Sequence, residues 1–308
     1  MLLACIGSLL IAMQADVPNA RVLTTNERRD YLRSRRVFDL LYRTAEAITV
    51  KVLSDGTLGS GILIQQQGLV YTVVTNSHVL RAGVAPYEIK TADGQIYTSE
   101  VVKTVNFEKY DLALLQFRSR GAVYEVAKLG RSSTLQIGDE VFSAGFPFAV
   151  AENPPVNASE LVQEFTGFVL REGRVSVVLD RELKDGYRIG YTSYVQKGMS
   201  GGPLLNLKGE LVAINGIHAY PLWDAPEYYQ DGTEPCQALQ EFITRSSFGI
   251  PIETVMEKAP KFTLKDVQIS PDDSGWRERI GELYRRRNVR DLIRKMRDEA
   301  ESATSCIE

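Results

Sequence analysis

The sequence predicts a mainly β protein, built as a sandwich or as barrels, with helical segments before and after the β region. Short β-rich runs separated by turn signals continue from about residue 47 to about residue 252. Over that span no strands alternate with long helices, which argues against a β-α-β sheet. The span of roughly two hundred residues suits two small barrels that share one cleft.

The composition is that of an ordinary globular protein and argues against some classes of function. The chain has 308 residues, 44% of them hydrophobic and 24% charged, which is ordinary for a globular protein with a sizeable core. A net charge of −3 argues against broad electrostatic binding to nucleic acid. The three cysteines, Cys5, Cys236 and Cys306, lack metal-ligand spacing, so we expect no metal site.

The first 15 residues form an apolar run of signal-peptide length that is too short to span a bilayer. Ala12 and Ala15 are small enough to serve as a cleavage site, although the usual positive n-region is missing. We expect export to the periplasm or the outside, with a cytoplasmic chain that has an apolar start as the alternative. If the leader is removed, Cys236 and Cys306 remain, and whether they pair is left open.

A helix is predicted over residues 26–45, where apolar residues recur partly at helical spacing among many charged ones. Asn26 is suited to cap its start. We interpret this segment as an amphipathic helix packed on the domain that follows. Binding to a membrane surface through its arginines is the minor alternative.

The β region begins where residues 48–53 alternate in strand fashion, followed by a Gly-rich turn over 54–61. A Gln-rich hairpin ending at Gly68 joins the next two runs. Strands are predicted at 48–53, 62–64, 69–74, 88–90, 96–105, 112–117, 140–143, 168–171, 175–178, 188–194, 211–217 and 249–252.

The stretch Lys197-Gly-Met-Ser-Gly-Gly-Pro-Leu204 places Ser200 between glycines and directly before apolar residues. Glycine reaches positive φ cheaply, so the backbone can bend sharply here. Such a bend can bare consecutive N–H groups, which would stabilise an oxyanion next to the hydroxyl. A simple Gly-Pro turn between two strands is the alternative.

Two further positions carry side chains suited to chemistry. His78, one of two histidines, stands at the end of an apolar run in Thr75-Asn-Ser-His78-Val. Asp111 heads the apolar run Asp-Leu-Ala-Leu-Leu, where a buried carboxylate costs several kcal/mol unless it is paired. Read singly, His78 is a satisfied core residue and Asp111 caps a turn. As a pair, they are suited to be a base and its orienting acid.

The order His78, Asp111, Ser200, with these local contexts, resembles the trypsin-like serine peptidases of the chymotrypsin fold. Each of the three motifs is weak alone, and the three in this order are specific. The resemblance implies two six-stranded antiparallel β-barrels.

The chain is most similar to the bacterial Deg/HtrA-like branch of that family. Leu58-Gly-Ser-Gly, Gly209-Glu-Leu-Val-Ala-Ile-Asn-Gly216 and Phe248-Gly-Ile-Pro-Ile252 carry this resemblance. It covers residues 46–256, with an approximate split into 46–135 and 136–256, and we expect no PDZ-like domain after it. Met199 departs from the family, which usually has Asp or Asn there. In the digestive members of the family, an Asp at this position pairs with a newly cut N-terminal ammonium and shapes the oxyanion hole. Met cannot form that ion pair, so we expect the oxyanion loop to be ordered by packing, oligomerisation or substrate.

The resemblance implies a serine endopeptidase that hydrolyses polypeptides through an acyl-enzyme, without metal or organic cofactor. Ser200 would be the nucleophile, His78 the general base and Asp111 the residue that orients the imidazole. The N–H groups of Gly198 and Ser200 would form the oxyanion hole. The alternative is a resting or inactive module of the same fold that acts in protein binding or chaperone-like quality control.

Substrate preference is weakly encoded. By its place in the motif, Tyr194 would lie at the base of the primary specificity pocket, and Asn215, Gly216 and Ile217 would line its wall. No acidic residue stands at the base, so small or apolar side chains are expected. His218 could line the same cleft or be solvated.

Three segments lie outside the core pattern. Residues 149–166 and 219–247 are insertions, and the second is aromatic-rich and either gates the cleft or packs on itself. Residues 257–308 form a helical extension in which Ser274 is suited to cap one helix and Leu292, Ile293 and Met296 continue an apolar face. We interpret it as a docked helix with a solvated charged face. Self-association or partner binding through this helix is the alternative.

Overall fold

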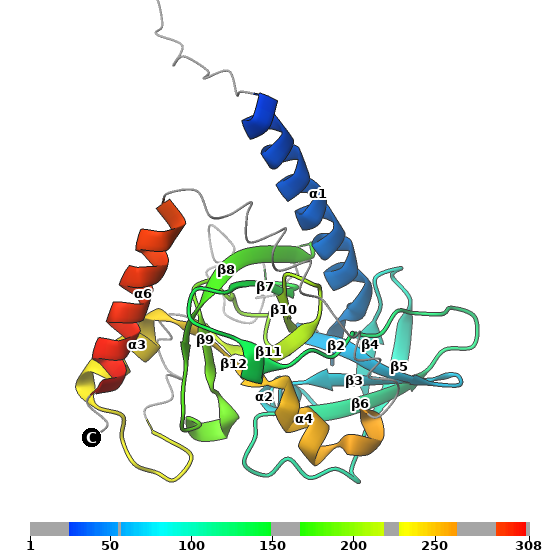
Figure 1. Cartoon of the computed structure of the whole chain (residues 1–308). Coiled ribbons are helices and arrows are strands. Elements are labelled where there is room, and N and C mark those ends of the chain that lie inside the picture. Colours follow the sequence, from blue (N-terminus) through cyan, green and yellow to red (C-terminus); the bar gives the residue numbers. More distant parts are fainter. Residues whose placement is uncertain (1–24, 55–56, 149–166, 219–227, 264–287, 306–308) are drawn as a thin grey trace, which may run out of the picture. The chain divides into compact units, whose positions relative to one another are not determined.

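The structure is a computed structural model that describes residues 25–54, 57–148, 167–218, 228–263 and 288–305. It falls into two units, residues 1–37 and residues 38–308. The described part of the first unit is the beginning of helix α1 (Thr25–Ile48). The second unit holds the end of α1 and every other described element (Figure 1).

Six antiparallel strands close the first barrel in the order β1-β2-β3-β6-β5-β4. The strand β1 pairs with β2 on one side and with β4 on the other, which closes the sheet. The strands are β1 (Thr49–Leu53), β2 (Thr57–Gln67), β3 (Val70–Thr75), β4 (Tyr87–Lys90), β5 (Ile96–Val101) and β6 (Ala113–Arg118).

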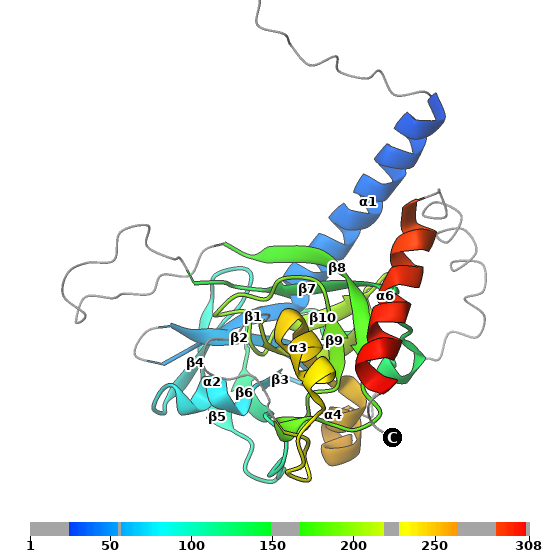
Figure 2. The same cartoon turned by 90° about the vertical axis from the view of Figure 1, so that its left-hand side faces the viewer.

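A second barrel repeats the same arrangement in the order β10-β11-β12-β9-β8-β7. It closes through pairing of β7 with β10. Its strands are β7 (Glu140–Gly145), β8 (Val169–Val178), β9 (Ile189–Tyr191), β10 (Pro203–Asn206), β11 (Leu211–Ile217) and β12 (Ser247–Pro251). Two closed six-stranded antiparallel barrels confirm the predicted chymotrypsin-type fold (Figures 1 and 2).

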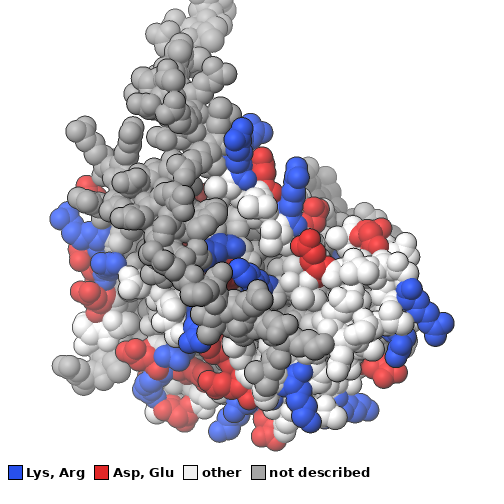
Figure 3. Space-filling view, turned by 45° about the vertical axis from the view of Figure 1, so that its right-hand side comes forward, with Lys and Arg blue, Asp and Glu red and all other residues white. Residues whose placement is uncertain are grey.

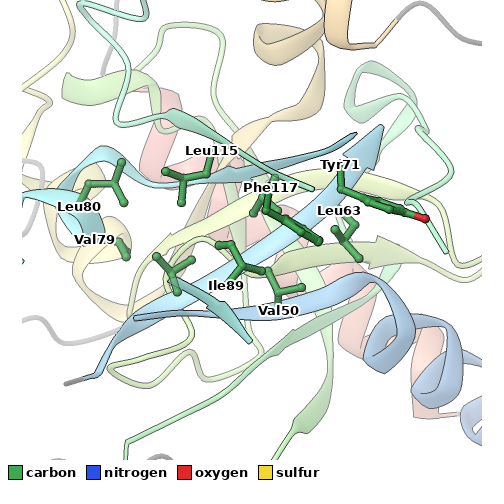
Figure 4. Close-up of a cluster of buried hydrophobic side chains, with 10 residues drawn as sticks. Val50, Leu63, Tyr71, Val79, Leu80, Ile89, Leu115 and Phe117 are labelled. Carbon is green, nitrogen blue, oxygen red and sulfur yellow. The ribbon is translucent and has the colours of Figure 1, made fainter. Parts of the chain in front are cut away.

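Alternating apolar side chains fill each barrel, because successive residues of a strand point to opposite faces. In the first barrel, Val50, Leu63, Tyr71, Leu115 and Phe117 converge in one buried cluster (Figure 4). The same cluster takes in Val79 and Leu80 from the short helix α2 (Ser77–Arg81). These two side chains therefore fix the helix that carries His78 to the barrel interior.

The remaining helices lie outside the barrels. The end of α1 contacts the second barrel region, where the rings of Phe38 and Phe142 lie 6.4 Å apart, edge to face. Helix α3 (Gln237–Arg245) precedes β12, and α4 (Ile252–Lys258) follows it. Helix α6 (Asn288–Thr304) lies beside α3 and contacts β8 (Figure 2). Short 3-10 turns at Ser132–Thr134, Lys184–Gly186 and Pro260–Phe262 complete the described elements.

Four sequence predictions fall wholly or partly outside the described residues. The possible leader over residues 1–15 and the insertion over 149–166 lie outside entirely, and of the insertion 219–247 only residues 228–247 are described. The Ser274 cap also lies outside. No described helix is long and apolar enough to cross a membrane. On the face drawn in Figure 3, acidic and basic side chains are interspersed.

Candidate active site

His78 sits in α2, one turn of helix directly after β3, rather than in the strand itself. Burial of Val79 and Leu80 beneath the helix leaves the His78 side chain 39% exposed. Its Nδ1 is hydrogen-bonded to Oδ2 of Asp111, and its backbone N–H donates to Oδ1 of the same carboxylate at 2.7 Å. The histidine and the aspartate are thus joined twice.

Asp111 stands just before β6 and is only 4% exposed. Besides the two bonds from His78, its carboxylate accepts the Ser77 hydroxyl at 2.7 Å and the Tyr187 hydroxyl at 2.6 Å. The Asn76 amide donates to the Asp111 carbonyl at 2.8 Å and fixes its backbone. Both carboxylate oxygens therefore have several donors, as a buried acid requires.

Burial by itself would raise the pKa of Asp111, because it disfavours the charged form. The hydrogen bond and charge of His78, followed by the bonds from Tyr187 and Ser77, outweigh burial and hold the pKa of Asp111 well below its usual range. Asp111 is consequently ionised at neutral pH, and its charge lies beside Nδ1 of His78.

Ser200 lies in the turn before β10, where Gly201 adopts φ +81°. Its carbonyl accepts the Ser60 N–H of the first barrel at 2.9 Å. Its Oγ donates to the Gly216 carbonyl at 3.2 Å. Within the described chain, no hydrogen bond joins Ser200 Oγ to His78, so the serine is the one predicted triad member not hydrogen-bonded to the other two.

The peptide units around Gly198 and Ser200 are oriented by their carbonyls. The Lys197 carbonyl accepts Phe148 N–H at 2.9 Å, and the Met199 carbonyl accepts Gly202 N–H at 3.0 Å. In a trans peptide the N–H points opposite to the C=O, so the N–H groups of Gly198 and Ser200 are turned away from these partners. In the described residues neither N–H donates to a backbone carbonyl.

Gly198 is required at its position by both backbone and space. Its φ is +93°, and a Cβ there would lie 2.5 Å from the Phe146 carbonyl oxygen. The Ser60 hydroxyl, from β2, donates to the Gly198 carbonyl at 2.7 Å. The turn is therefore held from both barrels.

The predicted pocket residues differ in what they offer to a ligand. Tyr194 is 50% exposed and Ile217 is 8% exposed. Asn215 is fully buried, and its amide donates to the carbonyls of Ala144 and Pro203 while its Oδ1 accepts the Tyr191 hydroxyl. The Asn215 side chain thus belongs to the barrel core. Its backbone N–H donates to the Gly202 carbonyl and its carbonyl accepts the Gly201 N–H, both at 2.8 Å, so the predicted role of Asn215 in contacting a ligand is not supported.

Two residues that were not predicted as site residues donate hydrogen bonds to the Asp111 carboxylate, namely Ser77 and Tyr187. Ser77 directly precedes His78 in the histidine motif, so a position near Asp111 could have been inferred from the sequence. Tyr187 lies 76 residues from Asp111 in the chain, and no local pattern marks it. Across the described residues, no group of three or more His, Cys, Asp or Glu side chains is placed to hold a metal ion.

Comparison with known proteins finds a peptidase family model and several serine proteases that are similar to this chain. The family model for the trypsin-like peptidase domain matches residues 59–214, half of the chain. Serine protease HTRA1 of Xenopus laevis is 32% identical over 162 residues, which cover 52% of this chain and 31% of that protein. The mitochondrial serine protease HTRA2 of Drosophila grimshawi is 28% identical over 207 residues, covering 63% of this chain and 44% of its own.

Among solved structures, the HtrA-type protease AlgW with a tripeptide has a similar fold, with a TM-score of 0.52 at 20% sequence identity. The match covers 74% of this chain and 64% of that chain. The chain spans less than half the length of the curated relatives described above.

Proposed function

The chain belongs to the trypsin-like peptidase domain family, and we propose that it is a serine endopeptidase in which Ser200, His78 and Asp111 form the catalytic triad. The observation that carries this proposal is the buried Asp111 carboxylate hydrogen-bonded to Nδ1 of His78. A buried ionised acid in that position serves to orient an imidazole and to stabilise its protonated form.

The proposed reaction begins at the Ser200 hydroxyl. Because Asp111 keeps the His78 proton on Nδ1, Nε2 is left as the acceptor for a proton. On substrate binding, Ser200 Oγ exchanges the Gly216 carbonyl for Nε2 and attacks the peptide carbonyl carbon. His78 then returns the proton to the leaving amine, and water hydrolyses the acyl-enzyme by the same route.

We assign the oxyanion hole to the N–H groups of Gly198 and Ser200. The orientation of the two peptide units supports this role, since both N–H groups are turned away from the carbonyl partners that fix them. Fixed donors of this kind lower the energy of the tetrahedral intermediate, and each contributes on the order of a hundredfold or more to turnover.

The substrates proposed are polypeptides, with a preference for small or apolar side chains beside the scissile bond. The exposed Tyr194 and the backbone of Gly216 and Ile217 are the proposed contacts. Export of the chain stays a prediction, because residues 1–15 lie outside the described structure. Self-association or partner binding through α6 likewise stays a prediction, and the exposure of Leu292 on this helix is compatible with it.

The decisive test is hydrolysis of an unfolded protein by the purified chain beside its Ser200→Ala variant. We expect fragments from the first and none from the second, because removing the nucleophile leaves only residual turnover. Fragment sequencing then gives the side-chain preference. Equal cleavage by both proteins would contradict the assignment of Ser200.

A second function is a resting module of the same fold, and one observation favours it. Ser200 Oγ is hydrogen-bonded to the Gly216 carbonyl and not to His78. A serine-directed covalent probe separates the two proposals. Labelling of Ser200 without any added partner indicates an assembled site, whereas no labelling together with no hydrolysis indicates a resting or binding module.

A further inference from the structure

The Asp111 carboxylate is bound from two sides. Helix α2 of the first barrel supplies the Ser77 hydroxyl and the backbone and ring of His78. Arg81 of the same helix lies 3.7 Å from Oδ1, with its side chain 67% exposed. Among the described residues, the only side-chain donor from the second barrel is the Tyr187 hydroxyl, 2.6 Å from Oδ2. Oδ2 is also the atom that faces Nδ1 of His78.

Tyr187 occupies space that Gly216 leaves open. A Cβ on Gly216 would lie 2.3 Å from both the hydroxyl oxygen and Cε1 of Tyr187. Gly216 is also the residue whose carbonyl accepts Ser200 Oγ. The buried tyrosine ring therefore lies between the acid of one barrel and the strand beside the nucleophile of the other.

The loop that carries Tyr187 is itself fixed to the Asp111 segment. The Asp111 N–H donates to the Asp185 carbonyl at 2.9 Å, and Asp185 adopts φ +65°. Gln230 accepts the Asp185 N–H at 3.0 Å, and its amide nitrogen lies 2.5 Å from the Lys109 carbonyl oxygen to which it donates. Gln230 lies in the described end of the 219–247 insertion, so this insertion supports the loop from outside.

We propose that Tyr187 is a positioning residue that acts through Asp111, holding Oδ2 in line with Nδ1 of His78 and tempering its negative charge. The inference rests on the proposed function in so far as that alignment serves peptide hydrolysis. The geometric claim concerns only the hydroxyl, the carboxylate and the imidazole. It is therefore testable without any turnover.

The test compares Tyr187→Phe with the unaltered chain by NMR titration of the histidine Cε1–H signals. With two histidines in the chain, the His218→Gln variant assigns the His78 signal. Without the hydroxyl, Oδ2 keeps more of its charge for the imidazolium, so the midpoint of the His78 titration should move to higher pH by about half a unit or more. The kcat should fall about tenfold with little change in KM.

Two controls separate this role from a merely structural one. Tyr71→Phe removes another buried tyrosine hydroxyl, which accepts the Tyr124 N–H at 3.0 Å inside the first barrel, and should leave the His78 signal and kcat unchanged. In an Asp111→Asn background, Tyr187→Phe should no longer move the His78 titration. Should Tyr187→Phe fail to fold, Gly216→Ala displaces the same hydroxyl and is held to the same NMR outcome.

The outcomes for the positioning role and for the proposed function are distinct. A folded Tyr187→Phe protein with an unchanged His78 titration overturns the positioning role, even if the chain hydrolyses peptides. A shifted titration in a chain that hydrolyses nothing supports the positioning role and overturns the peptidase proposal. A shift of the His78 titration of equal size in Tyr71→Phe overturns the positioning role, because the effect would then not be specific to Tyr187.

Discussion

Met199 occupies the position before Ser200, and its side chain is fully buried in the second barrel. It packs in one cluster with Val141, Tyr191 and Leu204, and its sulfur lies 3.4 Å from the Gln196 nitrogen. A buried apolar side chain orders the turn by packing, which was one of the routes expected once an ion pair at this position had been excluded.

Replacing Met199 with Asp should therefore impair both stability and activity. The new carboxylate would be buried without a partner among apolar side chains, at a cost of several kcal/mol. Met199→Leu conserves the volume and should cost less than about 1.5 kcal/mol and retain hydrolysis. Urea unfolding with peptidase assays on both variants measures the effect, and a fully active, stable Met199→Asp protein would refute the packing role.

The lowered pKa of Asp111 gives stability a defined dependence on pH. A carboxyl whose pKa is lower in the folded chain than the ordinary 3.8 stabilises the fold fully above that value. This contribution is lost as pH falls below 3.8 toward the folded pKa. The free energy of unfolding should thus fall more steeply below about pH 4 in the unaltered chain than in Asp111→Asn, by urea titrations from pH 6 to pH 2.5. Parallel curves would contradict this.

Among single residues, the sequence predicts a role for those whose neighbours in the chain are unusual for their type. Asp111 was identified because an acid heading an apolar run needs a partner, and the structure provides one in His78. Tyr187 escaped notice because tyrosine before a strand is common and its partner is distant in sequence. Asn215 was assigned to the pocket wall from its position, yet the direction of its side chain depends on strand register, which sequence does not specify.

At the level of elements, Cys236 marks the junction of α3 with the C-terminal helix. Cys236 is disulfide-bonded, and its sulfur lies 3.6 Å from the Ala303 carbonyl oxygen near the end of α6. The other cysteines, Cys5 and Cys306, lie outside the described residues. Because Cys306 follows α6 by two residues, we predict that it is the partner of Cys236.

Peptide mapping under non-reducing conditions should recover a Cys236–Cys306 linked peptide. The Cys236→Ser variant should lose about 2–4 kcal/mol of stability, since the bond closes a long loop. Ser305→Ala, whose hydroxyl bonds only within its own helical turn in the described structure, is a control expected to change little. Recovery of free Cys306 thiol from the oxidised chain would refute the pairing.

Two elements show where sequence patterns do not determine boundaries. Two runs, 168–171 and 175–178, were expected as separate strands, but β8 is continuous over Val169–Val178. Gly173 lies within this strand, where a Cβ would be 2.4 Å from the Ser193 nitrogen. This glycine therefore marks a close approach of two backbone segments rather than a turn. His78 similarly belongs to α2, whose single turn is too short to give a helical pattern.

At the scale of the whole peptidase domain, each barrel sends a side chain into the part of the site that the other carries. Tyr187 of the second barrel bonds Asp111 of the first. In the other direction, the Ser60 hydroxyl on β2 donates to the Gly198 carbonyl. The Ser60 hydroxyl oxygen also accepts the Phe146 N–H at 3.0 Å. The Ser60 N–H also donates to the Ser200 carbonyl at 2.9 Å. The geometry of the site therefore depends on how the barrels are joined.

Ser60→Ala should lower turnover, whereas a matched buried serine variant that loses similar stability should not. Ser60→Ala removes the hydroxyl that is bonded to the Gly198 carbonyl and to the Phe146 N–H. The proposed oxyanion hole then loses this support, and kcat should fall at least tenfold. The matched control is Ser99→Ala, a buried serine whose hydroxyl donates to the Tyr87 carbonyl within the first barrel. Both variants should lose about 1–3 kcal/mol by urea unfolding. Only Ser60→Ala should lose turnover, and equal turnover in the two would show that the bond between barrels does not support the site.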